Sequence, residues 1–158
     1  MISPDQRLQH QLEQEIRVMD RLLGLIREEQ TLLVEARIHD MGKVIEQKAR
    51  HIADLAQLAS QRHALLGESG CAAEEAGMQD YLARHPDAKL LGTWQKLIER
   101  VSAARGLNNT NGLMINTQLG RYRSALAILS GHNATLYGPD GQTNQAAIQQ
   151  RKRGFVSG

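Results

Sequence analysis

Aromatic residues and cysteines are scarce in this sequence, and each shortage narrows the range of folds. The 158 residues include one Phe, one Trp and three Tyr, so a globular core built around large rings is not expected. Cys71 is the only cysteine, which excludes a disulfide within the chain and fits a reducing compartment. No apolar run approaches the roughly 18 residues of a membrane-spanning helix, and the amino terminus lacks a signal-peptide pattern. We therefore expect a soluble, cytoplasmic protein.

The residue patterns of common catalytic and metal sites are also missing. None of the six His residues follows a Glu by three positions, as the di-iron helical bundles require. There is no His-Glu-x-x-His, no phosphate-binding Gly-Lys-Ser/Thr loop and no cluster of Cys with His. Glu35 and His39 can share a helix face, but isolated pairs of this kind are common on helix surfaces. The sequence predicts no enzyme activity, no metal and no cofactor.

Basic and acidic residues are mixed along the first 131 residues, with no excess of either sign. Residues 132–158 hold Arg151, Lys152 and Arg153 against Asp140, which accounts for the whole net charge of +2. The remaining sixteen basic and sixteen acidic residues are interspersed along residues 1–131. Nucleic-acid binders gather basic charge on one face, so a nucleic-acid partner is not expected.

Apolar residues recur at steps of three and four along three long stretches, which is typical of amphipathic helices. Ser3, Pro4 and Gln6 form a strong helix start, and Asp40 can cap a second helix. Lys48 falls on the apolar side of that second helix, where its stem should pack and its ammonium should reach solvent. The predicted helices span residues 4–36, 40–66 and 87–131, with a short helix near 78–84. A single bent helix over the first two stretches stays open.

These helices predict an all-α, elongated, antiparallel three-helix bundle that resembles a coiled coil. We expect residues 1–131 to form one domain. The third helix breaks its own pattern near its middle, where Asn108 and Asn111 occupy positions that the apolar stripe would fill. A polar residue at such a position lowers stability but fixes the register of the helices. Because Asn and Gly112 have poor helix propensity, this centre should be the least stable part of the helix.

The composition changes after Gly131. Residues 132–158 are rich in Gly, Asn, Gln and Ser, and a segment with so few residues able to bury is expected to be flexible. Leu136 and Tyr137 precede the turn sequence Gly138-Pro139-Asp140-Gly141. Two apolar side chains in a polar tail suggest a short recognition motif, although an unselected tail that contains one Tyr is the alternative.

Two motifs in this order and spacing resemble the FlgN-type flagellar export chaperones. They are the Asn-rich stretch from Leu107 to Ile115 and the stretch from Leu136 to Thr143. The segments Glu28–Leu33 and Ile45–Lys48 in the first two helices add weaker similarity. The resemblance covers nearly the whole chain, while the basic end, Arg151–Gly158, departs from it. It implies a cytoplasmic chaperone of the flagellar type III secretion system, which escorts hook-associated proteins, prevents their premature assembly and delivers them to the export gate.

The resemblance and the helix lengths together suggest two sites. The later half of the third helix is the candidate surface for the terminal helical segments of hook-associated proteins, because the longest helix should extend past the hairpin. Its residues are Leu113, Met114, Ile115, Leu119, Tyr122, Leu126 and Leu129. The alternative is that these residues belong to the core. For the export gate, the resemblance implies Leu136, Tyr137, Gly138, Asp140 and Gly141.

Two other functional classes stay open. A structural or adaptor coiled coil would use its apolar stripes for self-association. A helical enzyme or phosphotransfer domain would need an exposed His on a bundle face, and only His51 and His63 lie in mid-helix positions.

Overall fold

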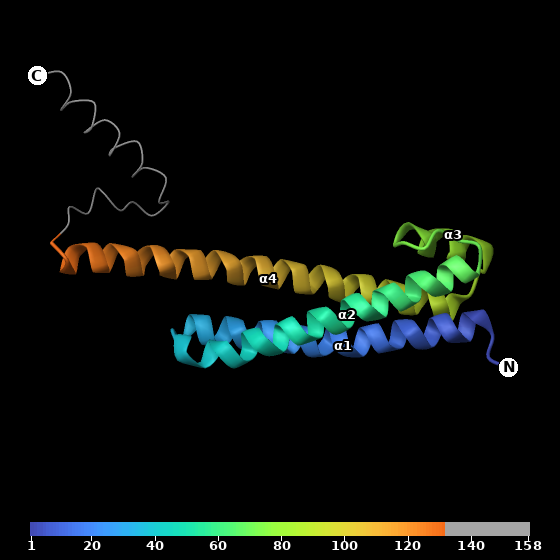
Figure 1. The fold of residues 1–158 in the computed structure, drawn as a ribbon, viewed down its shortest axis with the longest axis horizontal. Coiled ribbons are helices and arrows are strands. Elements are labelled where there is room, and N and C mark those ends of the chain that lie inside the picture. Colours follow the sequence, from blue (N-terminus) through green and yellow to red (C-terminus); the bar gives the residue numbers. More distant parts are fainter. Residues whose placement is uncertain (132–158) are drawn as a thin grey trace, which may run out of the picture. The chain divides into compact units, whose positions relative to one another are not determined.

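The computed structural model of the chain describes residues 1–131 and contains four α-helices (Figure 1). They are α1 (Pro4–Val34), α2 (Met41–Glu68), α3 (Ala76–Arg84) and α4 (Ala88–Leu129), and a 3-10 turn, η1 (Ile38–Asp40), precedes α2. Within the described residues there is no strand, so the predicted all-α class is confirmed. The chain divides into two compact units, residues 1–111 and 112–158, and α4 runs through both. The elongated three-helix bundle and the single domain over residues 1–131 stay predictions.

The start of α1 is the predicted capping box. The Ser3 hydroxyl accepts a hydrogen bond from the Gln6 backbone N–H at 3.2 Å, and the Gln6 side chain accepts from the Ser3 N–H at 3.0 Å. The helix ends two residues earlier than expected, because Ala36 adopts the left-handed conformation, with φ of 54°. The chain then reverses through η1, so the first two helical stretches form separate helices and the bent-helix alternative is wrong.

The prediction that Asp40 caps α2 is also wrong. Asp40 lies at the N-cap position but makes no capping hydrogen bond, because its carboxylate accepts from the Arg37 guanidinium at 2.9 Å. Asp87 does cap α4, through bonds from the backbone N–H groups of Lys89 and Leu90. The other helix ends lie within about two residues of the predicted ones.

The core of the first unit lies between α1, α2, α3 and the first part of α4. In α1 the residues that face inward follow alternating steps of four and three, which is the pattern of a coiled-coil seam. They are Leu8, Leu12, Glu15, Met19, Leu22, Ile26, Glu29 and Leu33, and all are buried. Leu66, Leu90, Leu97 and Ala104 add buried apolar groups from α2 and α4.

Hydrogen bonds give the direction of each helix in this unit. Contacts between α1 and α2 join early residues to late ones, as in Gln11 with the Leu58 carbonyl and Glu29 with Lys48, so the two helices are antiparallel. In contacts between α1 and α4 the residue numbers rise along both helices, from Gln9 with Thr93 to Asp20 with Arg100. The first part of α4 is therefore parallel to α1.

The short helix α3 lies at the end of this unit that holds the start of α1 (Figure 1). Tyr81 and Met78 are fully buried there, and the Tyr81 hydroxyl donates to Asp5 of α1. Burial raises the pKa of this phenol, and the Asp5 carboxylate raises it further. Gly77, in the first turn of α3, has no room for a side chain, because a Cβ there would lie 1.9 Å from the Ala72 carbonyl oxygen.

Candidate functional site

A buried ion pair crosses the hairpin near the end that holds α3. Glu15 and Arg62 are both buried, and the Arg62 Nε donates to Glu15 Oε1 at 2.8 Å. The Arg62 Nη2 also donates to Glu75 Oε1 at 2.6 Å, and the guanidinium lies 5.0 Å from the centre of the Trp94 ring, within cation–π range. Arg62 therefore joins α1, α2, α4 and the loop before α3.

The pKa values of the two carboxylates in this cluster, Glu15 and Glu75, are shifted in opposite directions. Burial raises the pKa of Glu15, although Arg62 works against the shift. At Glu75 burial alone would raise the pKa, but the hydrogen bond and charge of Arg62, with help from His63, lower it instead. The His63 Nε2 lies 3.0 Å from Glu75 Oε1. This arrangement is typical of a structural ion-pair network, which also perturbs pKa values without any catalytic role.

A second polar cluster lies two heptads further along the hairpin. The Lys48 ammonium donates to both oxygens of the buried Glu29 at 3.0 and 3.1 Å and to Asn108 Oδ1 at 2.8 Å. Asn111 is 1 % exposed and donates to Glu29 Oε1 and to the Ile26 carbonyl, each at 2.9 Å. The prediction that the Lys48 ammonium reaches solvent is wrong, because it is held by Glu29.

The Asn residues singled out in the sequence therefore bind the hairpin directly. Asn108 contacts Lys48 of α2 and Asn111 contacts α1, which ties α4 to both helices at one level. Gly112 is not required by close packing, because a Cβ there would meet nothing within 4 Å. That these residues set the register of α4 stays a prediction.

The apolar residues predicted to bind a partner lie in the second unit. We call Leu113, Met114, Ile115, Leu119, Tyr122, Leu126 and Leu129 the terminal stripe. Five of them are exposed, from 48 % for Leu119 to 83 % for Leu129, and Met114 and Ile115 are half-buried. Ile128, which is 70 % exposed, was not predicted because it falls outside the apolar periodicity.

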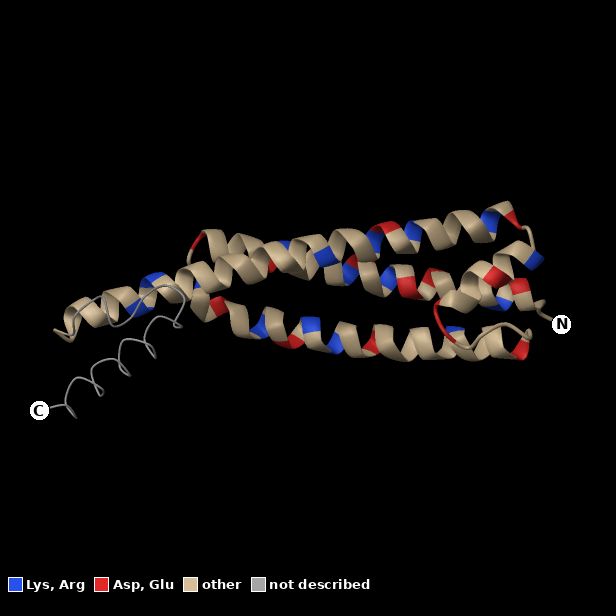
Figure 2. Ribbon diagram, turned by 90° about the horizontal axis from the view of Figure 1, so that it is seen from above, with Lys and Arg blue, Asp and Glu red and all other residues tan. Residues whose placement is uncertain are grey.

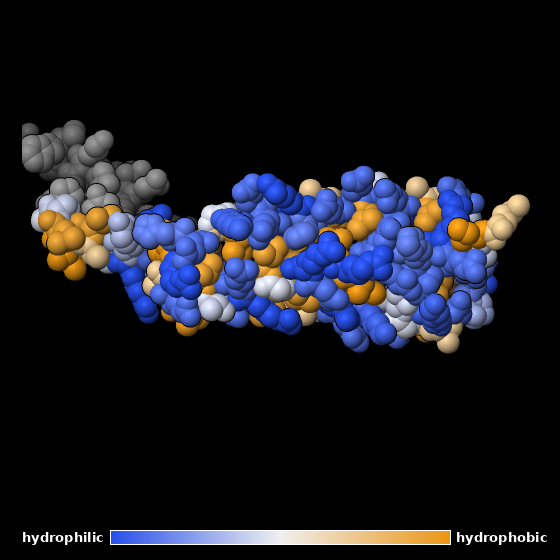
Figure 3. All heavy atoms as spheres, turned by 90° about the horizontal axis from the view of Figure 1, so that it is seen from below, coloured by the Kyte–Doolittle hydropathy of each residue, from blue (hydrophilic) through white to orange (hydrophobic). Residues whose placement is uncertain are grey.

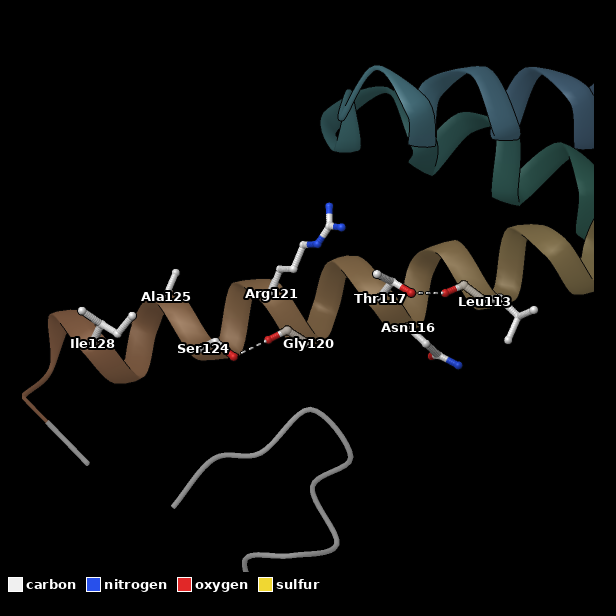
Figure 4. Close-up of a pocket in the computed structure, with 8 residues that line it drawn as sticks. All are labelled: Leu113, Asn116, Thr117, Gly120, Arg121, Ser124, Ala125 and Ile128. Carbon is white, nitrogen blue, oxygen red and sulfur yellow. Dashed lines mark hydrogen bonds between the residues drawn. The ribbon is translucent and has the colours of Figure 1, made fainter. Parts of the chain in front are cut away.

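A shallow groove runs along the same segment of α4 and shares Leu113 with the terminal stripe (Figure 4). Its described lining residues come from successive turns of this one helix: Leu113, Asn116, Thr117, Gly120, Arg121, Ser124, Ala125 and Ile128. The Thr117 and Ser124 hydroxyls donate to carbonyls four residues earlier, those of Leu113 and Gly120. These hydroxyls are therefore engaged within the helix.

The charged side chains in this part of α4 are all basic. After Glu99 the described residues contain no acidic side chain, whereas Arg121 and Arg123 lie on either side of Tyr122 in the sequence. Figure 2 shows basic residues and no acidic ones on the terminal turns, while both signs alternate along the hairpin. Hydrophobic patches interrupt the hydrophilic surface in the face drawn in Figure 3.

The predicted export-gate residues Leu136, Tyr137, Gly138, Asp140 and Gly141 lie outside the described residues. Within residues 1–131 no group of three His, Cys, Asp or Glu side chains is placed to hold a metal ion. No helix in this range is long and apolar enough to span a membrane.

Comparison with known proteins agrees with the resemblance noted in the sequence. The chain is 32 % identical over 153 residues to a flagella synthesis protein FlgN of Yersinia enterocolitica, covering 95 % of this chain and 98 % of that protein. The proteins of the same name from Salmonella typhimurium and Proteus mirabilis are 28 % and 27 % identical. Those two alignments cover 87 % and 92 % of this chain, and 91 % and 95 % of the respective relatives. No solved structure matches.

The family comparison covers the helices, the Asn-rich stretch and the first half of residues 132–158. The sequence model of the FlgN protein family matches residues 1–145, a range that includes both polar clusters and the terminal stripe. The chain belongs to the FlgN family.

Proposed function

We propose that this protein is a cytoplasmic flagellar export chaperone that binds hook-associated proteins, prevents their premature assembly and delivers them to the export gate. Membership of the FlgN family supports the flagellar chaperone role. The relatives named as flagella synthesis proteins align over nearly their full length. The choice of hook-associated proteins as clients, and of the gate as destination, goes beyond those names.

The observation that carries the proposal is the exposed end of the α4 seam. In the first unit this face packs through Leu97, Ala104 and Asn111. Continued in steps of three and four, the same face presents Ile115, Leu119, Tyr122, Leu126 and Leu129. These residues would bind the apolar face of an amphipathic client helix, as helix-in-groove complexes do. Met114 gives this surface a flexible side chain that adapts to its partner.

The charges beside the stripe restrict the client further. Because Arg121 and Arg123 flank Tyr122 and no acidic residue follows Glu99 in the described chain, a client helix with acidic residues beside its apolar face is favoured. The two arginines would attract a client helix with acidic flanks towards α4 and would repel a helix with basic flanks.

Two truncations separate a binding surface from a core. Leu119→Ala and Leu126→Ala should each weaken the affinity for a hook-associated protein, measured by isothermal titration calorimetry, with little change in the melting temperature of the free chain. The control is Leu97→Ala, since Leu97 is 3 % exposed and its truncation should cost about 2–5 kcal/mol of stability. If the two surface variants melt like the core variant, or bind clients normally, the assignment fails.

Delivery is assigned to the carboxy-terminal motif. We expect Tyr137 to dock on the cytosolic part of the export gate, where a buried aromatic anchor contributes about 2 kcal/mol or more. Tyr137→Ala should leave folding and client affinity unchanged but should reduce gate binding and secretion of the hook-associated proteins. Normal secretion by that variant, or a loss of client binding, would contradict this division of roles.

A further inference from the structure

Burial along α4 changes after Asn111. The buried residues of the first part of the helix recur every seven positions: Leu90, Leu97, Ala104 and Asn111. From residue 112 to residue 129 only Ala127 is buried, and most of the terminal stripe is exposed. Helices in proteins owe most of their stability to the packing of an apolar face rather than to intrinsic propensity. The first part of α4 has this support, and residues 112–129 have little of it.

Residues 112–129 are also poor in intrinsic helix propensity. They include five weak helix formers: Gly112, Asn116, Thr117, Gly120 and Ser124. The Thr117 and Ser124 hydroxyls donate to carbonyls four residues earlier (Figure 4), and such bonds slightly destabilise a helix. The segment contains no Asp or Glu, so no ion pair within it offsets these costs. Its own sequence therefore supplies little helical stability.

Asn111 separates the two parts of α4. Its hydrogen bonds to the Ile26 carbonyl and to Glu29 hold this turn of α4 on α1, and the first compact unit ends at the same residue. Unwinding that begins at Leu129 can therefore proceed towards Asn111 without breaking the buried contacts of the first unit.

We propose that α4 beyond Asn111 is helical for only part of the time in the free protein, and that binding of the client helix completes it. A short helix without packing is marginal in water even when it is rich in alanine, and this segment is not. The inference rests on the proposed function, because it takes the terminal stripe as the client site.

The client can bind only the helical state of this segment. Leu119, Tyr122 and Leu126 follow each other at steps of three and four, so they share one face only while the backbone is helical. The apparent affinity is therefore lower than the intrinsic affinity in proportion to the fraction of molecules that are helical there. This ordering cost keeps the complex weak enough for the client to be released at the gate.

Two glycines of α4 provide a matched pair of variants. A Cβ at Gly106 or at Gly112 would meet nothing within 4 Å, so alanine causes no clash at either position. Alanine favours the helical state over glycine by a factor of about two to five. Every helix that continues from the first unit passes through residue 112, so Gly112→Ala raises the helical population of the segment beyond it.

Titration calorimetry with a purified hook-associated protein tests the proposal. Gly112→Ala should bind about two- to fivefold more tightly than the wild type. Gly106→Ala should bind like the wild type, because residue 106 lies in the packed part of the helix, and should raise only the midpoint of urea unfolding. Equal affinity of Gly112→Ala and the wild type, or equal tightening by both variants, would overturn the proposal.

Hydrogen exchange of the free chain separates this inference from the proposed function. The amides of residues 116–129 should exchange at least about tenfold faster than those of residues 92–111, and should become protected when the hook-associated protein is added. Equal protection of both ranges in the free chain would overturn the inference and leave the proposed function intact. A wild type that binds no hook-associated protein would overturn the proposed function, and the inference with it, even if the free segment exchanges fast.

Discussion

At the scale of single residues, two charged side chains on the inward face of the hairpin have a burial that the sequence pattern did not predict. Glu15 and Arg62 occupy seam positions, and both are buried. The sequence places them there by spacing alone, but polar residues on a stripe are usually interpreted as solvated. Arg62 also contacts Glu75 and Trp94, because the loop before α3 and the start of α4 fold back onto it. No local sequence pattern predicts these two contacts.

Arg62→Leu should destabilise the protein by about 3–5 kcal/mol, because it leaves the Glu15 carboxylate buried without a counter-ion. Urea unfolding followed by circular dichroism measures the loss. The double variant Glu15→Leu with Arg62→Leu should recover most of it, since no lone charge then remains inside. A double variant as unstable as the single one would show that the pair contributes more than charge balance.

Glu75 predicts a pH dependence of a definite sign. Its pKa is lower in the folded protein than the usual 4.5, so its contribution is fully present above that pH and is lost as the pH falls through the lowered value. Glu75→Gln should therefore reduce the free energy of unfolding at pH 7 by about 1 kcal/mol or less, because the carboxylate is largely exposed. The difference between variant and wild type should shrink at pH 3. A gap that is equal at both values of pH would exclude this cause.

At the scale of helices, the two ion pairs between α1 and α2 favour one alignment of the hairpin. Glu15 with Arg62 and Glu29 with Lys48 lie two heptads apart on both helices. A slip of one heptad would place Glu15 opposite Leu55 and Glu29 opposite Met41, leaving charges buried against apolar groups. Polar residues at seam positions commonly set register in this way.

Helix boundaries were predictable where the signal is local. Ser3 and Gln6 are three residues apart, so their capping box could be read directly from the sequence. Asp40 failed as a cap because Arg37 competes for its carboxylate, and the left-handed Ala36 has no marker such as glycine. The burial of Asn111 could be anticipated, but its bonds to Ile26 and Glu29 required the packing of α4 on α1.

Asn111→Ala should lower the free energy of unfolding by about 1–3 kcal/mol, since the Ile26 carbonyl and the Glu29 carboxylate each lose a buried donor. Asn109→Ala is the matched control, because Asn109 is exposed on the same turn and its change should stay within about 0.5 kcal/mol. Chemical unfolding of both variants gives the comparison. Equal effects would show that helix propensity, rather than hydrogen bonding, dominates at these sites.

At the scale of the whole molecule, the sequence predicted a helical chain with an apolar stripe that continues to the end of α4. It could not decide between core and binding surface, because the periodicity is the same in both cases. The exposure of Leu113, Tyr122 and Leu129 favours a surface. The division of the chain after Asn111 had no signal beyond the weak helix formers around it.

If acidic client helices bind beside Tyr122, the affinity should depend on salt. Arg121→Gln and Arg123→Gln should each weaken client binding about two- to fivefold at low ionic strength, as expected for exposed ion pairs. The effect should disappear in about 0.5 M salt, where the Debye length is only a few ångströms. Arg27→Gln, on the exposed side of α1, serves as the control. Salt-independent losses would point to packing instead of charge.

The order of helices along the chain has a consequence for synthesis on the ribosome. The α1–α2 hairpin is complete at Glu68, but α4 does not reach Asn111 until 43 residues later. At about 5–20 residues per second this interval lasts roughly 2–9 s, whereas a helical hairpin of this size folds in far less than a second. During these seconds the nascent hairpin exposes the apolar face that α4 later covers, and Glu29 lacks its Asn111 donor. Growing chains on neighbouring ribosomes are therefore most prone to misassociate in this interval.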